Sequence, residues 1–237
     1  MTNDGTMGRF LVADLSRSES RCVSVPPGLY EDFVGGKGFG AKLLYDLVPA
    51  GADPLGLDNV LMFLTGPLTA TLAPAMRACV VTKSPLTGTF LDSYFGGRFG
   101  PEIKYAGYDG LIITGRAEVP TLLSIRDDQV AFRPAGKLWG TDALTANAGV
   151  KKALEADNAR VVTIGPAGEN RVRFALISCE YNRQAGRGGA GAVMGSKNLK
   201  AIAVSGTRLV RVNDNRAFEA AVSYTHLTLP TTRQRCS

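Results

Sequence analysis

Two glycine-rich stretches occupy matching places in this chain, residues 96–100 near the middle and residues 183–191 near the end. Each follows an apolar run typical of a β-strand and precedes a run typical of a helix. Glycine lets backbone N–H groups approach a ligand closely, and the start of a helix adds the positive end of the helix dipole. Each stretch is therefore a candidate cradle for an anion, and two cradles predict a ligand with two parts.

The surroundings of these stretches repeat as well. Each half contains a Gly-Pro pair, an arginine five residues before a hydroxyl residue, a glycine-rich stretch, and a strand-like run that ends in glycine. The matching features are Gly66-Pro67, Arg77 with Thr82, and residues 111–115 in the first half, and Gly165-Pro166, Arg173 with Ser178, and residues 201–206 in the second. The repeat predicts an internal duplication within one domain of residues 1–212, with units at about residues 8–116 and 119–208.

Both halves share one order of expected elements: hairpin, helix, strand, strand, glycine turn, helix, strand. In the first half the regular elements cover residues 8–25, 29–48, 60–65, 77–83, 101–106 and 110–115. In the second half they cover residues 121–132, 142–156 with Thr141 as the helix cap, 160–164, 173–179, 189–199 and 200–204. This order lacks the strict alternation of a doubly wound fold. It predicts an α+β fold of two mixed β-sheets with flanking helices and internal pseudo-twofold symmetry.

Composition excludes several functional classes. With 237 residues, 45% of them hydrophobic and 20% charged, the chain can bury a substantial core. The four cysteines are far apart, so local spacing builds neither a disulfide framework nor a metal site. The net charge is +6, but the basic residues are scattered, which disfavours nucleic-acid binding. We find no membrane-length apolar run and no signal-peptide pattern, and therefore expect a cytoplasmic protein that does not associate with membranes.

A third glycine run, residues 35–40, resembles part of a dinucleotide-binding fingerprint. It lacks both a preceding buried strand and a suitably placed acidic residue, which a nicotinamide-nucleotide site requires. We therefore interpret this run as a structural turn that interrupts the first helix.

Several unusual strings, in this order, carry a family resemblance: residues 81–88, 96–100, 104–109, 164–170 and 185–204. Together they resemble the N-terminal domain of the tungsten-dependent aldehyde ferredoxin oxidoreductases, over about residues 8–212. The resemblance implies a base of two sheets on which tungsten, or molybdenum, rests between two pterin dithiolenes. Two like pterins would match a domain built from two like halves.

The resemblance also implies the cofactor-binding residues. Arg77 would contact a pterin phosphate or ring edge. One pterin would be lined by Tyr94, Phe95, Gly96 and Gly97, and the other by Arg183, Gln184, Gly186 and Arg187. A magnesium ion between the phosphates would be held by the backbone carbonyls of Tyr94 and Gln184, where the archetypal member has Asn and Ala. Arginine suits phosphate because its planar group donates two parallel hydrogen bonds, and magnesium prefers hard oxygen ligands.

By the same resemblance the activity is oxidation of small aldehydes to carboxylic acids, with electrons leaving through a 4Fe–4S cluster to ferredoxin, in an assembly compatible with a homodimer. In that family the cluster cysteines lie in later helical domains, so we assign no catalytic residue here. The alternatives are a related bis-pterin reductase of the benzoyl-CoA reductase type and a non-catalytic phosphate-binding module.

The end of the chain has a different character. Residues 213–221 resemble the start of the family's next helical domain, cut short. Residues 222–237 resemble the translation of a transposase adapter used in preparing DNA sequencing libraries, and we interpret them as non-native. Because His226, the only histidine, lies there, we expect no histidine base or histidine metal ligand.

Overall fold

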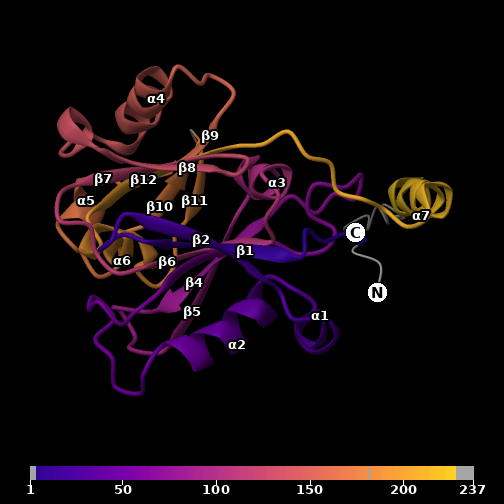
Figure 1. The fold of residues 1–237 in the computed structure, drawn as a ribbon, viewed down its shortest axis with the longest axis horizontal. Helices are drawn as coiled ribbons and strands as arrows, with labels where there is room; N and C mark the ends of the chain where they lie inside the picture. Colours follow the sequence, from indigo (N-terminus) through magenta and orange to yellow (C-terminus); the bar gives the residue numbers. More distant parts are fainter. Residues whose placement is uncertain (1–3, 181, 228–237) are drawn as a thin grey trace, which may run out of the picture.

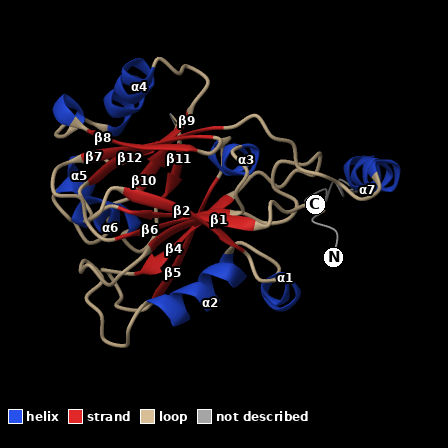
Figure 2. Ribbon diagram, viewed as in Figure 1, coloured by secondary structure: helices blue, strands red, loops and turns tan. Residues whose placement is uncertain are grey.

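The computed structural model describes residues 4–180 and 182–227, which form two six-stranded sheets (Figures 1 and 2). The first sheet has the order β2 (Glu19–Ser24), β1 (Arg9–Asp14), β6 (Gly110–Thr114), β3 (Leu61–Leu64), β4 (Ala78–Lys83) and β5 (Phe90–Phe95). The second has the order β8 (Gln129–Pro134), β7 (Thr121–Arg126), β12 (Leu199–Ser205), β9 (Arg160–Thr163), β10 (Ile177–Cys179) and β11 (Arg183–Ala185).

The two sheets have the same topology. In each, the only parallel pair joins the first strand of the half to its last, β1 with β6 and β7 with β12. All other neighbouring strands are antiparallel. The predicted α+β class, the mixed sheets and the internal duplication are therefore confirmed.

Helices lie outside and between the sheets (Figure 2). On the outer faces, α2 (Lys37–Leu47) covers the first sheet and α4 (Ala143–Leu154) the second. Between the sheets, α3 (Phe99–Tyr105) and α6 (Ala190–Ser196) each contact strands of both. The remaining helices are α1 (Pro27–Phe33), α5 (Pro166–Glu169), α7 (Asn215–Leu227) and a 3₁₀ turn at Gly136–Leu138.

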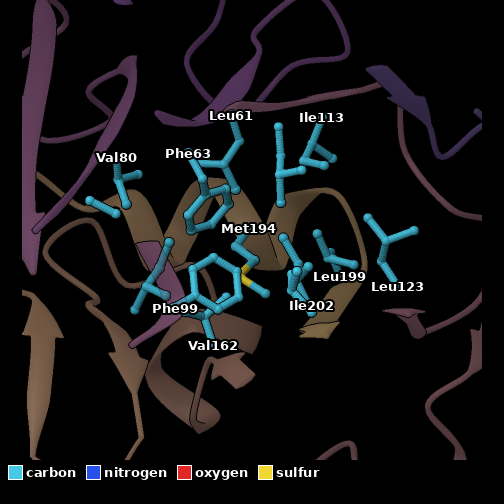
Figure 3. Packing of buried hydrophobic residues seen from close by; sticks show 14 of the residues in the cluster. Leu61, Phe63, Val80, Phe99, Ile113, Leu123, Val162, Met194, Leu199 and Ile202 are labelled. Carbon is cyan, nitrogen blue, oxygen red and sulfur yellow. The ribbon is translucent and has the colours of Figure 1, made fainter. Parts of the chain in front are cut away.

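Alternation along the strands sorts side chains between two clusters. In β4, Val80 points inward, whereas Cys79 and Val81 point outward toward α2. Figure 3 shows the inner cluster, in which Met194 of α6 and Phe99 of α3 lie among strand residues of both sheets. Because successive strand residues face opposite sides of the sheet, the register of each strand determines both which side chains enter the inner cluster and which enter the outer one.

Several predicted boundaries were wrong. The helix 29–48 is interrupted, as predicted, but only over residues 34–36, where Gly36 has a left-handed φ of 50°; α2 begins at Lys37 and includes the later part of the glycine run. The expected strand 173–179 is limited to β10, and the expected helix 189–199 ends at Ser196. The cap of α4 is Asp142 and not Thr141: Asp142 Oδ1 accepts hydrogen bonds from Leu144 N at 2.8 Å and Thr145 N at 3.0 Å.

The strand register corrects one detail of the repeat. Cys79 lies opposite Tyr94, and Ser178 lies opposite Gln184. On their other sides these residues pair with Leu64 and Thr163, each two residues before a Gly-Pro pair. Cys79 in the first half is therefore equivalent to Ser178 in the second half. By the same alignment, Arg77 is equivalent to Leu176. The expected correspondence of Arg77 with Arg173 was wrong by three residues.

Helix α7 stands apart from the body of the molecule (Figure 1). It continues without a break past the predicted boundary between residues 221 and 222. Residues 228–237 and the side chain of His226 lie outside the described part of the chain. No described helix is both long and apolar enough to cross a membrane.

Lys197, just after α6, joins the two halves of the duplication. Its Nζ donates hydrogen bonds to Asn59 O at 2.6 Å and Gly115 O at 3.1 Å, and the residue is 1% exposed. Among the described residues it forms no ion pair. Burial, with a smaller contribution from Arg116, lowers the pKa of Lys197 from 10.5 to about 8.

Lys197 should give stability a distinct pH dependence. Between pH 8 and 10.5 the unfolded chain binds more protons at this amine than the folded chain, so its contribution to the free energy of unfolding rises with pH, by about 2–3 kcal/mol. Burial raises the pKa of Cys79 and Cys179 to about 12. Above pH 9 these two thiols therefore lower the free energy of unfolding as the pH rises, which opposes the contribution of Lys197. The prediction is therefore measured as the difference in free energy of unfolding between the original chain and Lys197→Met, by urea titration at about pH 7.5 and 10. Relative to the variant, the original chain should be more stable at about pH 10 than at about pH 7.5. An unchanged difference would contradict a lowered amine pKa.

Candidate functional site

The two predicted glycine stretches lie side by side. The first follows β5 and the second begins with β11; these two strands are edge strands of their sheets and contact each other. A Cβ added to Gly96 would lie 3.7 Å from Cδ of Arg183, and Arg187 N donates to Ser93 Oγ at 3.2 Å. Residues far apart in the sequence, and placed in different halves of the duplication, thus meet at one location.

Tyr94 and Gln184 occupy corresponding positions on these two edge strands, opposite Cys79 and Ser178. Both side chains are exposed. Tyr94 points to the outer face of the first sheet, where the burial of part of its side chain and its contacts with Cys79 and Asp92 raise its pKa to about 12. The phenol is therefore neutral at physiological pH.

Phe95 occupies a different environment. Its side chain is 3% exposed and packs edge to face against Phe63 in the cluster between the sheets. Alternation along β5 dictates this orientation, because Tyr94 faces the opposite side. Only the backbone of Phe95 is thus placed to reach a ligand on the outer side.

The three predicted arginines, Arg77, Arg183 and Arg187, have exposed side chains. Within the described residues none of them forms an ion pair. Unpaired guanidinium groups beside glycine turns leave their hydrogen-bond donors available to an anionic ligand.

An open pocket of about 690 Å³ lies on the outer face of the first sheet. Arg77, Cys79 and Tyr94 line it, together with Gly36 and Lys37 from the glycine run that we interpreted as a structural turn. Arg183, Gln184, Gly186 and Arg187 do not line this pocket. Of the first set of predicted residues, only Arg77 and Tyr94 line this cavity, whereas Phe95, Gly96 and Gly97 do not.

The expectation that both turns present free backbone donors needs correction. Arg98 N donates to Glu180 Oε1 at 3.1 Å, and Arg187 N donates to Ser93 Oγ. These two N–H groups are therefore occupied by side chains of the opposite half. The sequence contained no signal for either contact, because the partners are 82 and 94 residues apart.

The described part of the site has no cluster of side-chain metal ligands. The described residues contain no group of three or more His, Cys, Asp or Glu side chains that could hold a metal ion. The available donors are guanidinium groups and backbone groups. This set fits an anionic organic ligand, with backbone oxygens for a hard cation.

Comparison with known proteins identifies the domain. Residues 10–206 match the family model of the aldehyde ferredoxin oxidoreductase N-terminal domain. The tungsten-containing aldehyde ferredoxin oxidoreductases of Pyrococcus furiosus and Thermococcus kodakarensis are 42% and 43% identical to this chain over 219 residues. Each alignment covers 92% of this chain and 36% of the relative. The chain thus spans about a third of the length of these relatives.

A solved structure is similar over the same region. The active site complex BamBC of benzoyl coenzyme A reductase, in complex with 1,5-dienoyl-CoA, superposes with a TM-score of 0.91 at 38% identity. The match covers 93% of this chain and 34% of that one. The chain described here belongs to the aldehyde ferredoxin oxidoreductase family and carries its N-terminal domain.

Proposed function

We propose that this chain is the cofactor-holding domain of a tungsten-containing oxidoreductase that oxidises aldehydes to carboxylic acids and transfers the electrons to ferredoxin. The observation that carries the proposal is the meeting of the two glycine turns, one from each half, with unpaired arginines around them. A ligand with two like anionic arms suits a doubled surface of this kind. The names of the relatives supply tungsten, aldehyde and ferredoxin.

Each predicted residue has a role in this proposal. Arg77 binds a phosphate or ring edge in the pocket on the first half, beside Tyr94. Arg183 and Arg187 bind the second arm, where Gly186 leaves open space. The backbone at Tyr94–Gly97 and at Gln184 lies against the two arms, and the carbonyls of Tyr94 and Gln184 hold a magnesium ion.

The bound tungsten group would supply the two-electron chemistry. This chain contributes binding and orientation through its arginines and the backbone of its two turns. The 4Fe–4S cluster, the catalytic residues and the aldehyde pocket would belong to the part of the relatives that this chain does not cover. We therefore expect the chain alone to be inactive.

The proposal is tested by metal and pterin analysis of the full-length protein. Charge-assisted hydrogen bonds contribute about 1.5–3 kcal/mol, so Arg183→Ala should weaken cofactor retention by about tenfold or more. Arg77→Ala should have a comparable effect. Arg17→Ala is the matched control, because Arg17 is exposed in the turn between β1 and β2, remote from both glycine stretches. Active protein that contains neither tungsten nor molybdenum would refute the proposal.

A second candidate is a reductase of the benzoyl-CoA type, which the TM-score of 0.91 favours. Both functions would use the same cofactor surface. Substrate assays separate them: aldehyde-dependent reduction of ferredoxin supports the first function, and turnover of a dienoyl-CoA thioester supports the second.

A further inference from the structure

Each glycine turn is held by a side chain from the opposite half of the duplication. Glu180, which lies between β10 and β11, accepts a hydrogen bond at Oε1 from Arg98 N in the first turn, at 3.1 Å. Ser93 of β5 accepts one at Oγ from Arg187 N in the second turn, at 3.2 Å. The two contacts are reciprocal, and neither belongs to a sheet or a helix ladder.

The Glu180 contact depends on a glycine. A Cβ added to Gly97 would lie 2.9 Å from Oε2 of Glu180 and 3.5 Å from Sγ of Cys179. Gly97 also has a φ of 90°, which side-chain-bearing residues rarely adopt. This glycine therefore lets a carboxylate of the second half reach the backbone of the first turn.

The backbone around Glu180 is itself held. Glu180 N donates to Val161 O at 3.3 Å, and its carboxylate lies 3.9 Å from the guanidinium of Arg160. The residue has a left-handed φ of 53°, a conformation that persists only where the surroundings impose it. Strand β9 thus fixes Glu180, and Glu180 fixes Arg98.

We propose that Glu180 is a positioning residue of the cofactor site, acting through the backbone of Gly97 and Arg98. A hydrogen bond to a charged acceptor is shorter and stronger than one between neutral groups. It fixes the end of β5, and with it the backbone of Tyr94 and Gly96. Ser93 does the same for Arg187 in the second turn. The role in cofactor binding rests on the proposed function; the contact between the halves does not.

The first test measures the contact itself, by hydrogen exchange of the Arg98 amide in the full-length protein. Glu180→Ala should speed exchange about tenfold, which corresponds to about 1.4 kcal/mol. Glu180→Gln keeps an oxygen acceptor and should restore most of the protection. Glu19→Ala, on the exposed edge strand β2, should change nothing. Unchanged exchange at Arg98 in Glu180→Ala overturns the inference.

The second test measures positioning, as the molar ratio of tungsten and pterin to purified protein. We expect at least a threefold loss for Glu180→Ala and near-normal content for Glu180→Gln. Asp142→Ala, which removes the cap of α4 on the far face of the second sheet, controls for lowered stability. If Asp142→Ala and Glu180→Ala unfold at the same temperature and lose the same share of cofactor, the positioning role of Glu180 is overturned. If the unmutated protein holds neither metal, the proposed function fails, whereas exchange at Arg98 still decides the contact.

Discussion

Replacing Asp109 by alanine is expected to lower the free energy of unfolding by about 3–5 kcal/mol, because it leaves the buried ammonium of Lys104 without its charged partner. Lys104 Nζ lies 2.7 Å from Asp109 Oδ1, and the side chains are 1% and 2% exposed. Burial lowers the pKa of Lys104, and the Asp109 carboxylate opposes that shift. Removing the carboxylate leaves a buried ammonium without a counter-charge, and of its two hydrogen bonds only the one to Gly5 O, at 2.7 Å, remains.

Asp109 has further partners whose loss adds to the effect. Its carboxylate accepts hydrogen bonds from Tyr30 Oη at 2.6 Å, Gly8 N at 2.7 Å and Met7 N at 2.9 Å. One side chain therefore holds the N-terminal segment, α1 and α3 together. Each donor left unsatisfied in the interior costs about 1–3 kcal/mol.

Chemical denaturation of Asp109→Ala and of a matched control measures this prediction. Asp46 pairs with Lys42 at 2.6 Å on α2, but both side chains are about two-fifths exposed. Exposed pairs of this type contribute about 0.3–0.5 kcal/mol, so Asp46→Ala should cost far less. Equal losses in the two variants would show that burial does not determine the strength of the Asp109 network.

The position of Asp109 in the first half is occupied by a residue of opposite charge, Lys200, in the second half. Asp109 O accepts from Thr65 N, and Lys200 O accepts from Ile164 N, at matching places in the two sheets. Lys200 is buried like Asp109, and its ammonium contacts Glu169. The duplication has thus kept the backbone, while the charge at this position is inverted and its partner comes from another element, Lys104 from α3 in one half and Glu169 from α5 in the other.

This inversion explains what the sequence could and could not predict. Glycine turns, Gly-Pro pairs and apolar runs repeat because they serve the backbone, and they predicted the duplicated α+β fold. The polar contacts differ between halves, so no repeat revealed them. The edge strands β5 and β11 were missed because each lacks a continuous apolar run: β5 alternates in burial, and β11 has only three residues. Their meeting depends on the packing of the two sheets.

Glycine positions illustrate the same limit. The second stretch, residues 183–191, predicted close approach of backbone to a ligand. In the structure its glycines differ: Gly186 has no atom near its missing Cβ, whereas an added Cβ at Gly189 would overlap the carbonyl oxygen of Arg173. Gly189 serves the packing of the chain, and Gly186 alone of this pair leaves space for a ligand.

Gly189→Ala should therefore destabilise the fold by about 3 kcal/mol or more. The residue has a φ of 86°, and a left-handed conformation costs an ordinary residue about 1–2 kcal/mol. Overlap with the Arg173 carbonyl adds about 1–3 kcal/mol, since backbone atoms cannot rotate away as a side chain can. Pro85, 2.8 Å from the added carbon, restricts relaxation on the other side.

Gly186→Ala is the control within the same turn. Its φ is not left-handed and its surroundings are open, so the free energy of unfolding should stay within about 0.5 kcal/mol of the original. Denaturant titration of both variants, with far-ultraviolet circular dichroism as the probe, measures the difference. A stable Gly189→Ala variant would mean that segment 173–176 can move away from the turn. In that case the turn is held by hydrogen bonds to two serines and not by the packing of Gly189. Ser84 Oγ donates to Gly188 O at 2.7 Å, and Ser93 Oγ accepts from Arg187 N.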